Sequence, residues 1–325
     1  MKIKYWQAVN EALGDALETD ERVILYGEDV GEAGGSFGAS KGLQERFGVN
    51  RVCDTPISEA AIVGLAVGSA MTGLRPIVEV MFMDFLGLAM DQLVNQAAKI
   101  SYMSGGAFRA PMVIRTLCGA GRGTGPQHSQ SFEGWLSNVP GLKVVWPSNP
   151  ADAYGLLRSA VDEDDPVVVI ESLRLWTMRQ DVDELVKVPL GQAAIRRIGA
   201  DVTLVAWGAA VQRAVTAAEQ CSERGIEVEV IDLRTISPLD EHTILVSLAK
   251  TGRLAIVEDG PGHVGVGTRL GALAAGPGFQ SLEAPVLHVC SPFAPVPFPL
   301  LLEDAYFPSA DQIVEAIIMR FQVRA

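Results

Sequence analysis

The 325-residue sequence contains only four cysteines, and no two of them form a C-x-x-C pair: they are Cys53, Cys118, Cys221 and Cys290. A zinc ribbon needs closely paired cysteines, and a disulfide framework needs a much denser set. Both kinds of scaffold are therefore excluded. We expect a protein of the reducing cytoplasm.

Long hydrophobic runs are also missing from the sequence. No uninterrupted apolar stretch reaches the roughly 18 residues that can span a bilayer. Residues 1–6 lack the apolar core and the small-residue cleavage site of a secretory signal. We therefore expect no membrane insertion and no export.

Positive charge is scarce: 26 lysines and arginines stand against 39 acidic residues, which gives a net charge of −13 and a pI near 4.8. Such a charge disfavours binding to nucleic acid or to anionic membranes. A basic surface on another protein is the more compatible large partner.

Short apolar runs alternate with helix-like segments along the whole chain. In the first part, strands are expected at 23–26, 76–82, 112–115, 142–146 and 167–170, and helices at 6–17, 58–72, 84–104 and 150–162. In the second part, strands are expected at 201–207, 226–232, 253–258 and 286–290, and helices at 209–224, 239–250, 264–275 and 310–321. Strands that are apolar on both faces and separated by helices indicate an α/β fold with a parallel sheet covered on both sides.

The chain is longer than one hydrophobic core usually organises, so we expect two domains. Residues 171–189 lack clear periodicity and include a mixed-charge run at 179–184. We therefore predict a first domain at 1–178, a linker at 179–190 and a smaller α/β domain at 191–325.

Glu59 is the first candidate functional residue. It ends the string Asp54-Thr-Pro-Ile-Ser-Glu59, which leads from an expected strand end into a helix. Open α/β sheets place ligand-contacting groups at such positions. A serine followed by an acid at a helix start is also typical of ordinary capping, which is the commoner explanation. The residues alone leave both interpretations open.

His128 is the second candidate, within Gln127-His-Ser-Gln130 and just after a run with four glycines at 119–125. Glycines at this density allow the backbone to approach a ligand closely. A lone loop histidine can equally be structural. If both candidates are functional, a carboxylate at a helix start and an imidazole on a glycine loop suit acid/base chemistry performed with a bound cofactor.

Polar side chains also lie near one face of the expected 84–104 helix: Asp91, Gln92, Asn95 and Gln96. Buried polar groups need partners, so we expect this face to pair with another helix across an interface.

Several strings occur together in a characteristic order and spacing. They are Tyr26-Gly-Glu-Asp-Val30, Arg51-Val-Cys-Asp-Thr-Pro-Ile-Ser-Glu59, Gly73-Leu-Arg-Pro76, Asp91-Gln-Leu-Val-Asn-Gln-Ala-Ala98, Tyr102-Met-Ser-Gly-Gly106, Gln127-His-Ser-Gln130, Pro140-Gly-Leu-Lys-Val-Val145, Ile231-Asp-Leu-Arg-Thr235, Pro238-Leu-Asp240, Pro295-Val-Pro297 and Leu302-Glu-Asp304. Together they resemble the β subunit of thiamine-diphosphate-dependent 2-oxo acid dehydrogenase E1 components over nearly the whole chain. The resemblance implies a transketolase-like pyrimidine-binding domain followed by a transketolase C-terminal domain.

The resemblance also implies an α₂β₂ heterotetramer that binds thiamine diphosphate between its subunits. The family's cofactor-activating glutamate corresponds to Glu59, which would bond N1′ of the aminopyrimidine. Phe85 corresponds to the aromatic residue that packs against this ring, and His128 to the active-site histidine that assists proton transfers.

Metal binding is divided between chains in this interpretation. The family motif for magnesium and the diphosphate, Gly-Asp-Gly followed by Asn-Asn, is absent from the sequence. The resemblance therefore implies that the E1 α subunit holds most of the Mg²⁺ site and that this chain is active only with it. Some relatives hold a potassium ion mainly through backbone carbonyls, at positions that match Met112, Ala160, Val161, Glu163 and Asp165.

The substrate is suggested by three strings, 114–119, 146–150 and 291–298, which are more similar to acetoin dehydrogenase β subunits than to pyruvate dehydrogenase ones. We expect cleavage of pyruvate or acetoin next to the carbonyl and transfer of the acyl group to the lipoyl arm of an E2 acyltransferase. One alternative is a non-catalytic E1β-like scaffold that assembles an α subunit and recruits E2. Another is a self-sufficient transketolase-like enzyme.

Overall fold

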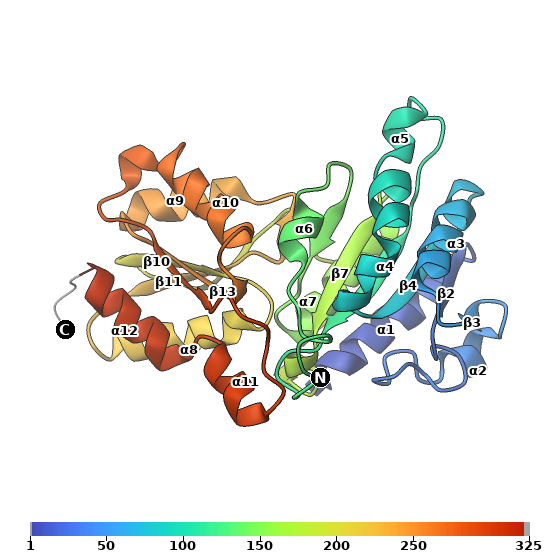
Figure 1. Cartoon of the computed structure of the whole chain (residues 1–325), viewed down its shortest axis with the longest axis horizontal. Helices are drawn as coiled ribbons and strands as arrows, with labels where there is room; N and C mark the ends of the chain where they lie inside the picture. The colour runs from blue at the N-terminus through green and yellow to red at the C-terminus, as the bar shows by residue number, and fades with distance from the viewer. Residues whose placement is uncertain (1, 322–325) are drawn as a thin grey trace.

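The computed structural model describes residues 2–321, which form two large β-sheets, each covered by helices on both faces (Figure 1). The first sheet has the strand order β12-β6-β7-β5-β4-β2-β3. Six of its strands come from the first 172 residues: β2 (Val23–Gly27), β3 (Val52–Asp54), β4 (Arg75–Phe82), β5 (Val113–Cys118), β6 (Lys143–Val145) and β7 (Val167–Ser172). These six strands are parallel, as the sequence predicts.

Two helical layers enclose the first sheet. On one face lie α1 (Tyr5–Thr19) and α7 (Pro150–Asp162), and on the other lie α3 (Glu59–Met71) and α4 (Leu86–Met90). Asn149 caps α7 by accepting the Asp152 N–H at 3.0 Å, and Pro150 occupies the first turn, where its missing N–H is harmless. The predicted helix at 150–162 is therefore confirmed with its bounds.

The second sheet has the order β14-β13-β10-β11-β9 and is smaller. Its strands are β9 (Ala194–Arg197), β10 (Val202–Ala206), β11 (Val228–Asp232), β13 (Leu254–Pro261) and β14 (Leu287–Ser291). On one face pack α8 (Ala210–Ser222) and α12 (Ala310–Phe321), and on the other pack α9 (Glu241–Thr251) and α10 (Val266–Ala275). The edge strand β9 is antiparallel to β11, and it is not among the strands expected from the sequence.

A strand from the second half of the chain completes the first sheet. β12 (Thr235–Ser237) follows β11 in sequence but pairs antiparallel with β6. The Trp146 N–H also donates to the Arg234 carbonyl at 2.8 Å. One continuous hydrophobic core accordingly joins the α3 face of the first sheet to the α9 face of the second.

The predicted linker at 179–190 begins with regular structure. β8 (Arg179–Asp181) pairs antiparallel with the N-terminal strand β1 (Lys2–Lys4). This pairing holds the N-terminal strand β1 in place, directly before α1. Two short helices complete the first part, α2 (Leu43–Phe47) and α6 (Glu133–Ser137), and α11 (Leu300–Tyr306) precedes the last helix.

The predicted helix at 84–104 is wrong as a single α-helix. The segment begins with a 3₁₀ turn at Met83–Phe85, continues through α4 and a π-helical stretch at Asp91–Ala97 (η2), and ends in α5 (Ile100–Met103). A π-turn contains an extra residue per turn, which an apolar period of three to four residues does not reveal. Inside η2, the Asn95 amide donates to Asp91 at 2.7 Å, and both residues are exposed on the surface.

Candidate active site

The candidate residues follow neighbouring strands of the first sheet, on the edge where the strands end. The strands β5, β4, β2 and β3 lie side by side and are parallel. His128 follows β5, Phe85 follows β4, and Glu59 follows β3 at the sheet margin. Carboxyl ends of parallel strands form the ligand-binding edge of open α/β sheets. The structure thus brings all three predicted residues to one edge.

Strand order also shows how far apart the strands that precede the two titratable candidates are. Three strand spacings of about 4.8 Å separate β5 from β3, or roughly 14 Å. Because Glu59 and His128 follow strands that are not neighbours, we expect them to act on different parts of one ligand rather than on each other. Phe85 follows a strand between them.

Glu59 is the first residue of α3, and its carboxyl is partly buried. The preceding residue, Ser58, makes no side-chain capping hydrogen bond, so the ordinary capping interaction is missing at this helix. Glu28, just after β2, has a raised pKa because of partial burial and because the charges of Asp29 and Glu59 disfavour its ionisation. Glu28 and Glu59, which follow two different strands, thus lie near each other at this edge.

His128 lies among aromatic rings. Its ring centroid is 4.9 Å from that of Phe82 and 5.5 Å from that of Phe85, and both pairs have edge-to-face geometry. Phe82 and Phe85 also contact each other, with centroids 5.7 Å apart. Edge-to-face packing holds the partly buried imidazole in place without using its nitrogen atoms, which stay available for a ligand.

The glycine-rich loop before His128 is folded back on itself. The Gly119 N–H donates to the His128 carbonyl at 3.0 Å, and the His128 N–H donates to the Gly125 carbonyl at 3.3 Å. A Cβ atom at Gly119 would lie 2.1 Å from the His128 carbonyl oxygen, so only glycine fits there. The glycine density noted in the sequence therefore has a structural cause at the position that fixes the histidine.

A buried ion cluster lies within the sheet behind this edge. Arg115 on β5 donates to Glu79 at 2.6 Å and to Glu171 at 2.7 Å, and all three side chains are buried. Burial alone would lower the pKa of Arg115, but the neighbouring carboxylates raise it, so the guanidinium stays charged. Because each charge has a hydrogen-bonded partner on a neighbouring strand, the cluster fixes β4, β5 and β7 together.

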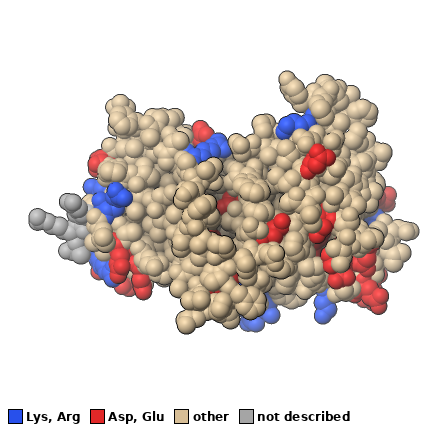
Figure 2. Space-filling model, viewed as in Figure 1, with Lys and Arg blue, Asp and Glu red and all other residues tan. Residues whose placement is uncertain are grey.

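A cavity of about 750 Å³ lies beside the His128 loop, where the two halves of the chain meet. Its lining includes Gln127, Gln130, Trp135, His263, Phe293 and Tyr306. Figure 2 shows a hollow near the middle of this face, with acidic atoms visible inside it and mostly uncharged surface around it. Aromatic and polar groups from both halves of the chain therefore face a shared space next to the candidate site.

Glu133 lines the same cavity and is 3% exposed. Burial, together with the nearby charge of Glu258, raises its pKa to about 7. The Trp207 indole N–H donates to one Glu133 oxygen at 3.4 Å, while the other oxygen has no hydrogen-bond partner. A carboxyl in this position keeps its proton up to neutral pH.

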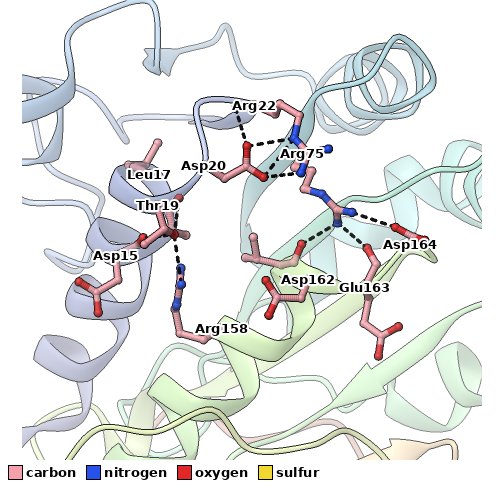
Figure 3. A network of polar contacts seen from close by, with 12 residues as sticks. Asp15, Leu17, Thr19, Asp20, Arg22, Arg75, Arg158, Asp162, Glu163 and Asp164 are labelled. Carbon is pink, nitrogen blue, oxygen red and sulfur yellow. Dashed lines mark hydrogen bonds and ion pairs between the residues drawn. The ribbon is translucent and has the colours of Figure 1, made fainter.

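Two of the five predicted potassium positions contact Arg75, whose guanidinium points towards Glu163 and Asp164 in Figure 3. Nη1 of Arg75 donates to the carbonyl oxygens of Val161 and Glu163, both at 2.9 Å, and Nη2 donates to Asp164 at 2.8 Å. The other predicted carbonyls, Met112 and Ala160, accept the backbone N–H groups of Val167 at 3.0 Å and Glu163 at 3.3 Å.

The side chains at the predicted potassium positions are also paired. Lys143 donates to the Glu163 carboxylate at 2.5 Å and lies 3.7 Å from that of Asp165. With the carbonyls already accepting from Arg75, this set does not fit a potassium ion in the geometry described. Within residues 2–321, no group of three or more His, Cys, Asp or Glu side chains is arranged to hold a metal ion.

Two family models match the chain. Residues 1–177 match the transketolase pyrimidine-binding domain, and residues 191–313 match the transketolase C-terminal domain. The acetoin:2,6-dichlorophenolindophenol oxidoreductase β subunit of Bacillus subtilis is 48% identical over 96% of this chain and 95% of its own length. The chain belongs to the E1 β-subunit family. The expected resemblance and the transketolase-like α/β fold are thereby confirmed.

Further relatives agree with this assignment. The pyruvate dehydrogenase E1 component β subunit of Staphylococcus epidermidis is 42% identical over 95% of each chain. A split-gene transketolase, solved as an inactive β4 tetramer, has the same fold with a TM-score of 0.80 at 19% identity, over 99% of each chain. The protein is thus an E1 enzyme subunit of a thiamine-diphosphate family, with an E1 α subunit as its partner. None of the described helices is long and apolar enough to cross a membrane.

Several residues of the site were missed by the sequence reasoning. Phe82 contacts His128, Glu28 lies near Glu59, and Glu303 binds the glycine loop from 180 residues away. Their positions could have suggested both Phe82, the last residue of a strand, and Glu28, the first residue after one. Only the string Leu302-Glu-Asp304 pointed to Glu303, and it did so through resemblance rather than chemistry.

Proposed function

We propose that this E1 β subunit binds the aminopyrimidine end of thiamine diphosphate through Glu59 and Phe85 and uses His128 for proton transfer at the reacting end. The observation that supports the proposal is the common sheet edge of these three residues. A partly buried carboxyl and a partly buried phenyl ring suit a flat, nitrogen-rich ring. When bound, the cofactor supplies an electron sink for cleavage beside a carbonyl.

Glu59 in this proposal shares a proton with the pyrimidine nitrogen N1′. Glu59 is the first residue of α3, and its carboxyl oxygens can accept that hydrogen bond. A water-poor subunit interface would strengthen the sharing. His128, fixed by Phe82 and Phe85, has its ring nitrogens available to hold or deliver a proton to the substrate.

The E1 α subunit in this proposal covers the helices beside the edge. Large apolar side chains are exposed on α3, on α4 and just before α3: Leu65, Leu88 and Ile57. Tyr102, Met103 and Phe108, on and after α5, are also exposed but lie towards the other end of the sheet. Exposed apolar groups gathered on neighbouring elements mark protein interfaces. The α subunit would also supply most of the Mg²⁺ ligands, in an α₂β₂ heterotetramer.

For the substrate, we propose acetoin or pyruvate, with the acyl group passing to the lipoyl arm of an E2 acyltransferase. The relatives named for acetoin are 48% and 44% identical to this chain, and those named for pyruvate dehydrogenase are 42% identical. The acidic net charge of −13 suits a basic E2 docking segment. A substrate panel with the reconstituted pair decides between the two compounds.

Three further assignments complete the proposal. The domains divide at 1–178 and 191–325, supported by two large sheets that, apart from β12, each take their strands from one of these parts. Arg75, rather than a potassium ion, supplies the positive charge at the end of α7, supported by its hydrogen bonds to Val161 and Glu163. The enzyme works in the cytoplasm, supported by its four free cysteines.

The decisive experiment replaces Glu59 with glutamine in the complex reconstituted with its α subunit. We expect assembly to be unchanged and turnover to fall by at least about 100-fold, because an amide cannot share the proton. Glu32→Gln, an exposed acid near the same edge, is the control. Unchanged turnover in Glu59→Gln would remove Glu59 from the mechanism and favour the scaffold alternative.

A further inference from the structure

The loop that ends at His128 is held from the opposite half of the chain. Glu303, on α11, accepts the Gly121 N–H on Oε1 and the Gly123 N–H on Oε2, each at 2.8 Å. Its side chain is 0% exposed. A buried carboxylate that accepts two backbone N–H groups makes strong, charge-assisted hydrogen bonds with a fixed geometry.

The glycines allow this arrangement. Gly121 and Gly123 have positive φ values of 90° and 65°, which are strained for other residues. A Cβ atom at Gly121 would lie 2.4 Å from Nε of Arg174. At Gly125, a Cβ atom would lie 3.0 Å from the ring of Phe298, just before α11. The loop is therefore packed tightly against the segment that contains Glu303.

The same loop determines where the histidine lies. Gly119 and Gly125 form backbone hydrogen bonds with His128 on either side of the two N–H groups that Glu303 accepts. The carboxylate thus fixes the middle of a closed loop whose two ends bond to His128. A change in Glu303 is transmitted to His128 through a few backbone hydrogen bonds.

We propose that Glu303 is a positioning residue for catalysis, which sets the loop so that His128 faces the reacting end of the ligand. This inference rests on the proposed role of His128. It assigns a task in the reaction to the C-terminal half of the chain, which supplies none of Glu59, Phe85 or His128.

The test uses Glu303→Gln in the complex reconstituted with its α subunit. Glutamine keeps the shape and can accept one N–H, but its amide group opposes the other. With reduction of 2,6-dichlorophenolindophenol as the assay, we expect kcat to fall by at least about tenfold, with KM and cofactor affinity changing less than about twofold. Asp304→Asn is the control, because Asp304 lies on the same helix but is largely exposed and forms a long ion pair with Arg174, at 3.4 Å.

A double-mutant cycle separates positioning from general stability. If Glu303 acts through His128, Glu303→Gln should have almost no further effect on kcat in a His128→Gln background. A purely structural role predicts the same fold-loss in both backgrounds. Equal losses, or full activity in Glu303→Gln, would overturn the proposal.

We call the two hydrogen bonds from Gly121 and Gly123 to Glu303 the clamp. The clamp can be tested without an activity assay, because the exposed Arg122 lies between these two glycines. We expect trypsin to cleave after Arg122 much faster in Glu303→Gln than in the wild type or in Asp304→Asn. Should Glu303→Gln fail to assemble, hydrogen exchange in the wild-type complex decides instead. Protected amides at Gly121 and Gly123 support the clamp, and exchange as fast as in an open loop contradicts it.

These measurements also keep the two proposals apart. If His128→Gln leaves turnover unchanged, the proposed function of His128 fails, while cleavage at Arg122 still reports whether Glu303 holds the loop. If cleavage is unaffected by Glu303→Gln, the clamp fails whatever His128 does.

Discussion

Burial of the Glu133 carboxyl should make the folded protein less stable as the pH rises. Replacing Glu133 with glutamine should remove this pH dependence. The folded protein raises the pKa of Glu133 from 4.5 to about 7. Below pH 4.5 the carboxyl is protonated in both the folded and the unfolded chain and has no effect. Between these two values the unfolded chain releases the proton while the folded chain retains it, so folding becomes less favourable as the pH rises.

The size of this effect follows from the shift. At about 1.4 kcal/mol per pKa unit, the free energy of unfolding falls by roughly 3 kcal/mol across the window from pH 4.5 to pH 7. Glutamine has nearly the same shape, can still accept the Trp207 N–H, and does not ionise. The variant should therefore match the wild type near pH 4.5 and exceed its stability above pH 7.

The assay is urea unfolding of the purified subunit at several pH values, followed by tryptophan fluorescence. Glu219→Gln, an exposed acid on α8, controls for the change in net charge. A stability difference between wild type and Glu133→Gln that stays constant from pH 5 to pH 8 would refute the assigned pKa. If the stability difference between Glu219→Gln and the wild type also grows with pH, the change in net charge explains the effect and the pKa of Glu133 does not.

Two further predictions concern Arg75 and Gly119. Arg75→Gln should lower the free energy of unfolding by about 3 kcal/mol in urea unfolding, because the partly buried guanidinium donates three hydrogen bonds to the chain around the end of α7. The activity of the wild-type protein should be equal in potassium and choline buffers. Stimulation by potassium would support a potassium site at these positions and contradict the assignment to Arg75. Gly119→Ala should reduce kcat by about 100-fold in the reconstituted pair, since the new methyl would clash with the His128 carbonyl and open the loop. Wild-type activity in that variant would contradict the role assigned to the loop.

Local patterns in the sequence were sufficient for much of the fold. The helix at 150–162 has an Asn cap, a proline in its first turn and a clear apolar face, so its bounds match those of α7. The start of α3 at Glu59 and the glycine loop before His128 could be identified in the same way. For α7 the determining interactions lie within a few residues of each other.

Features that depend on distant contacts were not predictable in this way. The edge strand β12 looks like a connection after β11, and only its pairing with β6 makes it a strand. The π-helical stretch at Asp91–Ala97 interrupts a segment whose apolar pattern resembles one long helix. Glu303 is an ordinary helix acid in sequence, and its two loop partners lie about 180 residues away. Tertiary packing decides all three.

The most direct test of the account is a structure of this chain reconstituted with its α subunit and thiamine diphosphate. We predict a Glu59 carboxylate oxygen within about 3 Å of N1′ of the aminopyrimidine, the Phe85 ring against that heterocycle, and His128 facing the thiazolium. An aminopyrimidine bound away from the ends of β3 and β4 would contradict the assignment of this sheet edge as half of the active site.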